Sequence, residues 1–210
     1  MAGYSRDGFH WHRPDRGALI PVSERKGDWN WGNVQSAGGC VLVVRDKLYF
    51  YVSGRAGTPG TSASGVSSTG LAILRRDGFA SMDAGVAEGT LTTRLVRFSG
   101  KYLFVNAALN GGELRAEVLD ADGRVIVPFT RKSSVPLRHD STLAQLRWKG
   151  FTDLSSLEGK PVRFRFYLRH GSLYSFWVSG ERSGASHGYV GAGGPGYTGP
   201  TDTVGIKAYK

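Results

Sequence analysis

The sequence contains one cysteine, Cys40, among 210 residues. A single thiol excludes an intramolecular disulfide framework and a cysteine-rich zinc site. Cys40 opens a short apolar run that ends at Val44. We therefore expect a buried, unreactive side chain at this position.

Long hydrophobic runs are also absent. No window of 18 consecutive apolar residues occurs, so the sequence predicts no membrane-spanning helix. The first residues lack the apolar segment of a signal peptide. Without disulfides, the chain is compatible with the cytoplasm and equally with a fragment of a secreted enzyme, so the sequence leaves its location open.

The sequence is basic but has no basic run. Its net charge is +10, from 27 Lys and Arg residues against 17 Asp and Glu residues. Most of the cations stand singly or in pairs such as Arg131-Lys132. This spacing favours a solvated basic surface over a nucleic-acid site, while a polyanion-binding module stays open as an alternative.

Familiar catalytic and metal motifs are missing as well. There is no nucleophile elbow, no phosphate-binding glycine loop and no His-Glu-x-x-His motif. His10 and His12 lie on one face of an expected strand, but a metal site needs a further ligand. Asp120-x-Asp122-Gly123 begins like a calcium loop without its later ligands, so we expect a hairpin turn there. The sequence predicts no metal and no cofactor.

Glycine, in contrast, is abundant: 31 residues, about twice the average usage. Many glycines and few helical patterns indicate many turns and an all-β fold. Clean alternation of apolar and polar residues runs through Glu113–Leu119 and Val162–Arg169. From Leu91 onward strand-like runs recur regularly, which predicts an antiparallel β-sandwich of jelly-roll-like form.

The expected organisation has three parts. Residues 1–53 form a β segment resembling one blade of a β-propeller, and residues 54–69 a linker rich in glycine and serine. Residues 70–210 form the sandwich, with a glycine-rich loop at 180–203 and a last strand at 204–209. Gly70–Thr93 is the joint between the blade-like part and the sandwich.

Local turns are expected wherever glycine or polar residues interrupt apolar runs. Asp7-Gly8 and Arg45–Lys47 each predict a hairpin, and Asp153–Gly159 predicts a short helical turn or a loop. Asn110–Gly112 and His170–Ser172 predict two further turns, each separating two strands.

Aromatic residues are dense near the start of the chain. The set comprises Trp11, Trp29, Trp31, Tyr49 and Tyr51. Such rings either pack in a core or stack on the C–H faces of sugar rings, and the sequence leaves both interpretations open.

Charged residues give two further hypotheses. Asp77 and Asp83 are the most suggestive carboxylate pair, although each also suits a turn. Three outward arginines on one expected strand face two outward glutamates on another: Arg163, Arg165 and Arg169 face Glu113 and Glu117. Cross-strand charge pairs are expected, and binding of acidic sugars is the alternative.

Several stretches together resemble the last blade and the following sandwich of a five-bladed β-propeller glycoside hydrolase of the invertase and levanase type. They are Ser5–Pro14, Gly27–Gly32, Asp46–Tyr51, Gly70–Gly85, Glu117–Gly123, Val162–Phe166 and Leu173–Phe176. The likeness covers about residues 3–178 and leaves the glycine-rich tail outside. It implies a carbohydrate-active protein with the same fold.

The catalytic motifs of such enzymes are not found here. The sequence has no Asn-Asp-Pro, no Arg-Asp-Pro and no Glu-Cys, so no catalytic residue is carried over. The first hypothesis is therefore a sandwich that contacts glycans or stabilises a glycosidase, with the five aromatic residues binding carbohydrate. The second is a small autonomous glycosidase, whose candidate carboxylates are Asp77, Asp83, Glu117 and Asp120. An incomplete blade has open sheet edges, which also predicts a homodimer.

Overall fold

This computed structural model describes residues 2–5, 7–37, 41–57 and 67–210, and its regular structure is almost entirely β-strand. Cys40 lies outside the described residues. The strands are β1 (Tyr4–Ser5), β2 (Trp11–His12), β3 (Asn33–Ser36), β4 (Leu42–Val44), β5 (Lys47–Arg55), β6 (Ser67–Arg75), β7 (Met82–Ala84), β8 (Gly89–Thr92), β9 (Tyr102–Leu119), β10 (Ser141–Gln145) and β11 (Arg163–Ser179). Among the described residues, two 3-10 helices, η2 (Ser155–Leu157) and η3 (Gly205–Tyr209), accompany the strands. The all-β prediction is confirmed.

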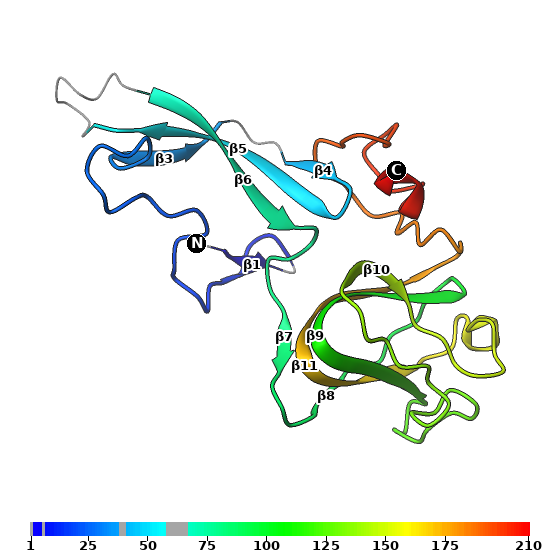
Figure 1. Cartoon of the computed structure of the whole chain (residues 1–210). Helices are drawn as coiled ribbons and strands as arrows, with labels where there is room; N and C mark the ends of the chain where they lie inside the picture. Colours follow the sequence, from blue (N-terminus) through cyan, green and yellow to red (C-terminus); the bar gives the residue numbers. More distant parts are fainter. Residues whose placement is uncertain (1, 6, 38–40, 58–66) are drawn as a thin grey trace.

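Residues 82–179 form the β-sandwich, around the long antiparallel pair β9 and β11. The order in its sheet is β10-β9-β11-β7, and β8 pairs with β11 beside β7. β8 borders the first half of β11 and β7 the second, so the sheet curls around its own core (Figure 1).

The core confirms the alternation read from the sequence. Its members from the two long strands are almost fully buried: Leu103, Val105, Leu114, Ala116, Val118, Phe164, Phe166 and Leu168. Rings of Phe98, Phe164, Phe166 and Phe176 contact one another with centroids 5.2 to 6.3 Å apart. Burial of these side chains is the main stabilising contribution to the sandwich.

The two turns expected at Asn110–Gly112 and His170–Ser172 are wrong, since both segments lie inside continuous strands. The register of β9 and β11 shifts between Arg169 and Gly171, where the strands approach closely. A Cβ atom on Gly112 would lie 2.0 Å from the carbonyl oxygen of Arg169. Glycine therefore permits a close backbone approach here, and the sequence alone does not distinguish that need from a turn.

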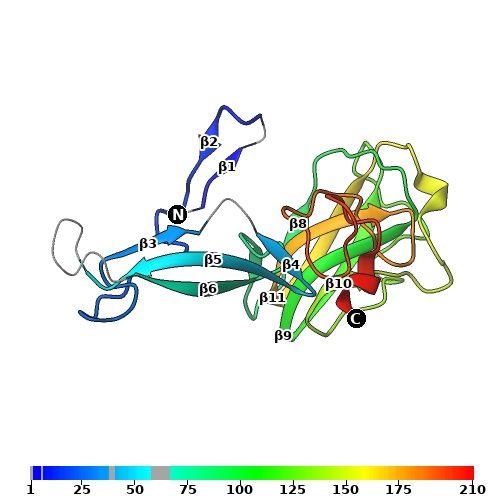
Figure 2. The same ribbon diagram turned by 90° about the horizontal axis from the view of Figure 1, so that it is seen from above.

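We call residues 2–75 the arm. Within its described part, β5 pairs with β3, β4 and β6 to form a four-stranded sheet, and β1 and β2 form a separate hairpin (Figure 2). The hairpins expected at Asp7-Gly8 and at Arg45–Lys47 are both present. β6 belongs to this sheet, so the joint begins after Arg75 rather than at Gly70, and the expected linker contributes residues to both β5 and β6.

The strand expected at 204–209 is wrong, because this segment forms the 3-10 helix η3. The carboxylate of Asp202 accepts hydrogen bonds from the backbone N–H groups of Val204 and Gly205. Gly205 has a φ of 56°, a left-handed conformation that a strand does not accommodate. The preceding tail packs on the arm, where Val190 and Tyr197 join Val43 and Leu48 in a small second core.

The helical turn expected at 153–159 is present as η2. In the part of the chain that the structure describes, no helix is long and apolar enough to cross a membrane.

Candidate functional site

The joint between arm and sandwich, which we call the seam, is built by two consecutive arginines at the end of β6. The guanidinium of Arg75 donates to Asn106 Oδ1 at 2.7 Å and to the carbonyl of Ala107 at 3.0 Å, both on β9. It also pairs with Asp140 at 2.6 Å. Arg75 thus attaches the arm to β9 of the sandwich.

Arg76, the first residue after β6, is buried. Its Nη2 lies 2.9 Å from the carboxylate of Asp202 in the tail, and its carbonyl accepts from Asn106 Nδ2 at 2.6 Å. The rings of Tyr197 and Tyr209 each lie 5.7 Å from its guanidinium carbon. Burial raises the pKa of Tyr197 to about 12, so this phenol is neutral at physiological pH. Arm, sandwich and tail meet at this one cation.

Asp77, the next residue, lines a cavity of about 270 Å³. The exposed rings of Phe79 and Tyr189 and the buried side chain of Arg76 contribute to its lining. Desolvation by the surrounding protein raises the pKa of Asp77, and the nearby Arg76 opposes that rise. Because 63% of the Asp77 side chain remains exposed, water limits this shift. Of the four carboxylates predicted as catalytic candidates, Asp77 alone borders the seam.

The other three candidates accept hydrogen bonds within turns or between paired strands. Hydrogen bonds from Ser172 and Ser81 lower the pKa of Asp83. Asp120 accepts the backbone N–H groups of Asp122 and Arg124, as the predicted hairpin turn requires. These are the contacts of carboxylates that stabilise turns and strand ends.

Glu117, expected on the outward face, is instead buried on β9, where Tyr167 donates to it at 2.6 Å and Arg165 pairs with it at 3.1 Å. The predicted cross-strand charge pair is therefore confirmed for Arg165 and Glu117. Glu113, opposite Arg169, pairs instead with Arg115 and Arg138.

Strand register separates Glu117 from Asp83. Glu117 lies opposite Arg165 and Asp83 opposite Ser172, which places them about 23 Å apart along β11 at roughly 3.3 Å per residue. Paired catalytic carboxylates need about 5–9.5 Å. Catalysis by Asp77 with Asp83 stays a hypothesis.

The five predicted carbohydrate-binding residues lie at separate places on the arm. Tyr49 and Tyr51 point to one face of β5, and the indole of Trp29 covers the other face. A Cβ atom on Gly54 or on Gly70 would lie 2.3 Å from that indole, so both glycines make room for it. Trp31 is half-buried beside β3.

Trp11 lies on the separate β1–β2 hairpin, where 62% of its surface is exposed. Its indole Nε1 donates to the carbonyl of Gly8 at 3.1 Å. The carboxylate of Asp7 stabilises the turn, because it accepts hydrogen bonds from the backbone N–H groups of Phe9 and His10. It also contacts the ring nitrogen Nδ1 of His10. These hydrogen bonds, that of the His10 side chain first, hold the pKa of Asp7 well below its usual range. The hairpin thus fixes an indole in an exposed position.

Phe9, at the tip of the same hairpin, is 86% exposed and is not among the carbohydrate-binding residues predicted from the sequence. Its position directly after the Asp7-Gly8 turn is the sequence feature that indicates an exposed ring. His10 is engaged by Asp7, and no cluster of three or more metal-ligating side chains occurs among residues 2–5, 7–37, 41–57 and 67–210.

Comparison with known proteins assigns no family. No family model, no curated protein and no solved structure matches this chain.

Proposed function

We propose that this protein is a carbohydrate-binding relative of the terminal part of a glycoside hydrolase, and that its arm contacts the glycan through exposed aromatic rings. The observation that carries this proposal is the fixed, exposed indole of Trp11. A ring that the free protein already holds in place loses little conformational entropy when a ligand stacks on it.

Polar groups lie on the same hairpin. Tyr4, Ser5, Asp7, His10 and His12 line an open hollow of about 460 Å³. Hydroxyl, carboxylate and imidazole groups are donors and acceptors suited to sugar hydroxyls, while Trp11 and Phe9 offer apolar faces to sugar C–H groups. Trp11 and Phe9 are not among the residues that line this hollow, so the hairpin carries apolar rings and a polar hollow as separate features.

The test is binding of the full chain to levan, arabinoxylan and dextran, measured by isothermal titration calorimetry. We expect Trp11→Ala to weaken binding of the preferred polysaccharide at least tenfold. Phe151→Ser is the matched control, because this exposed ring lies on the sandwich, outside both the hairpin hollow and the cavity beside Asp77. Equal losses for both variants, or a loss for Phe151→Ser alone, would overturn the proposal. Binding to heparin with a steep salt dependence, and to none of the three glycans, would support the polyanion alternative instead.

The seam favours a second candidate function, hydrolysis of a glycoside with Asp77 as one of the carboxylates. Its supporting observation is that Asp77 lines a cavity to which the rings of Phe79 and Tyr189 also contribute. Turnover of aryl glycosides by the wild-type chain, lost in Asp77→Asn and in Asp83→Asn, would support this function. Activity that neither substitution affects would remove this pair from consideration.

A further inference from the structure

A pocket of about 330 Å³ opens in the sandwich, where the segment 133–149 divides. We call residues 133–139 and 141–149 the two limbs of this segment. The limbs are joined at one end, since the N–H of Val135 donates to the carbonyl of Arg147 and the N–H of Lys149 to the carbonyl of Ser133. Beyond that point each limb pairs with a different half of β9. Leu137 pairs with Leu114, and β10 pairs with residues 104–107. The two limbs separate because they pair with different halves of β9, and the space between them is the pocket.

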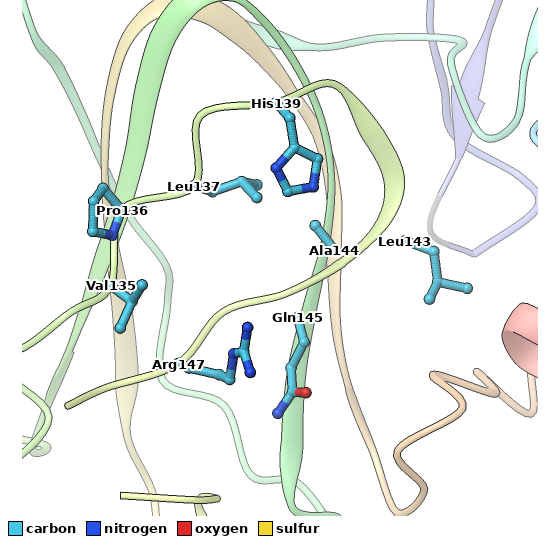
Figure 3. A pocket seen from close by; sticks show the side chains of 8 residues that line it. All are labelled: Val135, Pro136, Leu137, His139, Leu143, Ala144, Gln145 and Arg147. Carbon is cyan, nitrogen blue, oxygen red and sulfur yellow. The ribbon is translucent and has the colours of Figure 1, made fainter. Parts of the chain in front are cut away.

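Three polar side chains and an apolar surface line this space. Gln145 and Arg147 lie on the same face of one limb. His139 lies across the opening, at the end of the pocket away from Arg147 (Figure 3). Val135, Pro136 and Leu137 provide the apolar lining on the opposite limb. The pocket is at the lower end of the range of small-molecule sites, about 300–1,000 Å³.

These polar groups are available to a ligand. Within the part of the chain that the structure describes, the side chains of His139, Gln145 and Arg147 make no hydrogen bond or ion pair. The neighbouring charges are already engaged, since Arg138 pairs with Glu113 and Asp140 with Arg75. Arg147 is therefore the cation that an anion entering this pocket would meet.

We propose that this pocket binds a small sugar acid, with Arg147 holding its carboxylate. A guanidinium presents two parallel N–H donors that match a carboxylate. The amide of Gln145 both donates and accepts, and the His139 imidazole adds a further polar group, so together they suit hydroxyl groups. The apolar lining suits the C–H face of a pyranose ring. This site is separate from the aromatic hairpin and does not depend on its function.

The test is titration of the full-length protein with glucuronate, followed by calorimetry, with glucose and inorganic phosphate as the comparison ligands. We expect glucuronate to bind at least tenfold more tightly than either. Glucose lacks the carboxylate that Arg147 holds, and phosphate lacks the ring and hydroxyls. Glucose binding as tightly as glucuronate would overturn the proposal, and so would phosphate binding equally tightly.

Variants then place the binding in this pocket. Arg147→Ala should weaken glucuronate binding at least tenfold, and Gln145→Ala should weaken it several-fold. Arg124→Ala is the matched control, because Arg124 is an exposed arginine in the turn after β9 and should leave binding unchanged. Thermal melting of each variant verifies that the fold is retained. Wild-type affinity in folded Arg147→Ala would refute the assignment.

Discussion

The sandwich and the arm are both antiparallel β-structure, yet they bury their side chains to very different extents. The sandwich closes its sheet around a large cluster of buried aliphatic and aromatic residues. The arm contributes Val43 and Leu48 to a small core that is completed by Val190 of the tail. The comparison shows that the arm depends on contacts supplied from elsewhere in the chain.

One face of the arm sheet remains open. Tyr49 pairs in register with Ile73, and Tyr51 with Leu71, so four apolar side chains share this face. Tyr51, Leu71 and Ile73 are exposed. β6 pairs with β5 on one side, and within the described residues its other edge has no strand beside it. Such an edge is a natural place for a second chain to pair, and the predicted homodimer stays a prediction.

The largest effect should come from the sandwich core. Phe164 is fully buried among three other phenylalanine rings, so Phe164→Ala should lower the free energy of unfolding by about 3–5 kcal/mol. Ile73→Ala, on the open face of the arm, should change it by less than about 0.5 kcal/mol. Urea denaturation measures both. Similar losses for the two variants would mean that the open face is covered in solution.

The seam should give the next effect, because it joins the two regions. Arg76→Met leaves the carboxylate of Asp202, which is 1% exposed, without its cation. We expect a loss of about 3 kcal/mol in the free energy of unfolding. Adding Asp202→Asn removes the uncompensated charge while retaining an acceptor for the N–H groups of Val204 and Gly205, so the double variant should recover part of that loss. A double variant less stable than Arg76→Met would contradict this account.

The same comparison separates what the sequence predicts from what it does not. Alternation along Glu113–Leu119 and Val162–Arg169 identifies the core faces, because period-two burial is local. The Asp7-Gly8 hairpin is likewise local, since Asp7 bonds to groups two and three residues away. Arg76 and Asp202 are 126 residues apart, and no local pattern connects them.

The candidate sites follow the same rule. Trp11 and Asp77 could be selected from the sequence because an aromatic ring near a turn and a carboxylate in a glycine-rich joint are visible there. The pocket beside Arg147 could not be predicted, because it exists only where the two limbs of the segment 133–149 pair with different halves of β9. The continuity of β9 and β11 through their glycines was missed for a related reason, since close approach of two backbones is a tertiary property.

A smaller effect should follow from filling the space under Trp29. Gly70→Ala places a methyl group where the indole now lies, so we expect a loss of about 2 kcal/mol in the stability of the arm. Gly85→Ala is the matched control, because a Cβ atom there meets nothing within 4 Å. Thermal unfolding followed by tryptophan fluorescence reports on both variants. An unchanged transition in Gly70→Ala would indicate that Trp29 is not held against β5 and β6.

The smallest effect concerns the β1–β2 hairpin alone. The folded-state pKa of Asp7 lies below its ordinary value of about 3.9, so ionised Asp7 stabilises the turn fully above that value. This contribution is lost as the pH falls from about 4 toward the folded-state pKa. We therefore expect the NMR signals of Phe9, His10 and the Trp11 indole to lose their folded positions in acid before those of Phe164. Asp7→Asn should abolish that pH dependence, because no charge remains to titrate. Asp15→Asn, which alters a neighbouring turn carboxylate, should preserve it. A pH response that survives in Asp7→Asn would assign the acid sensitivity of the hairpin to another group.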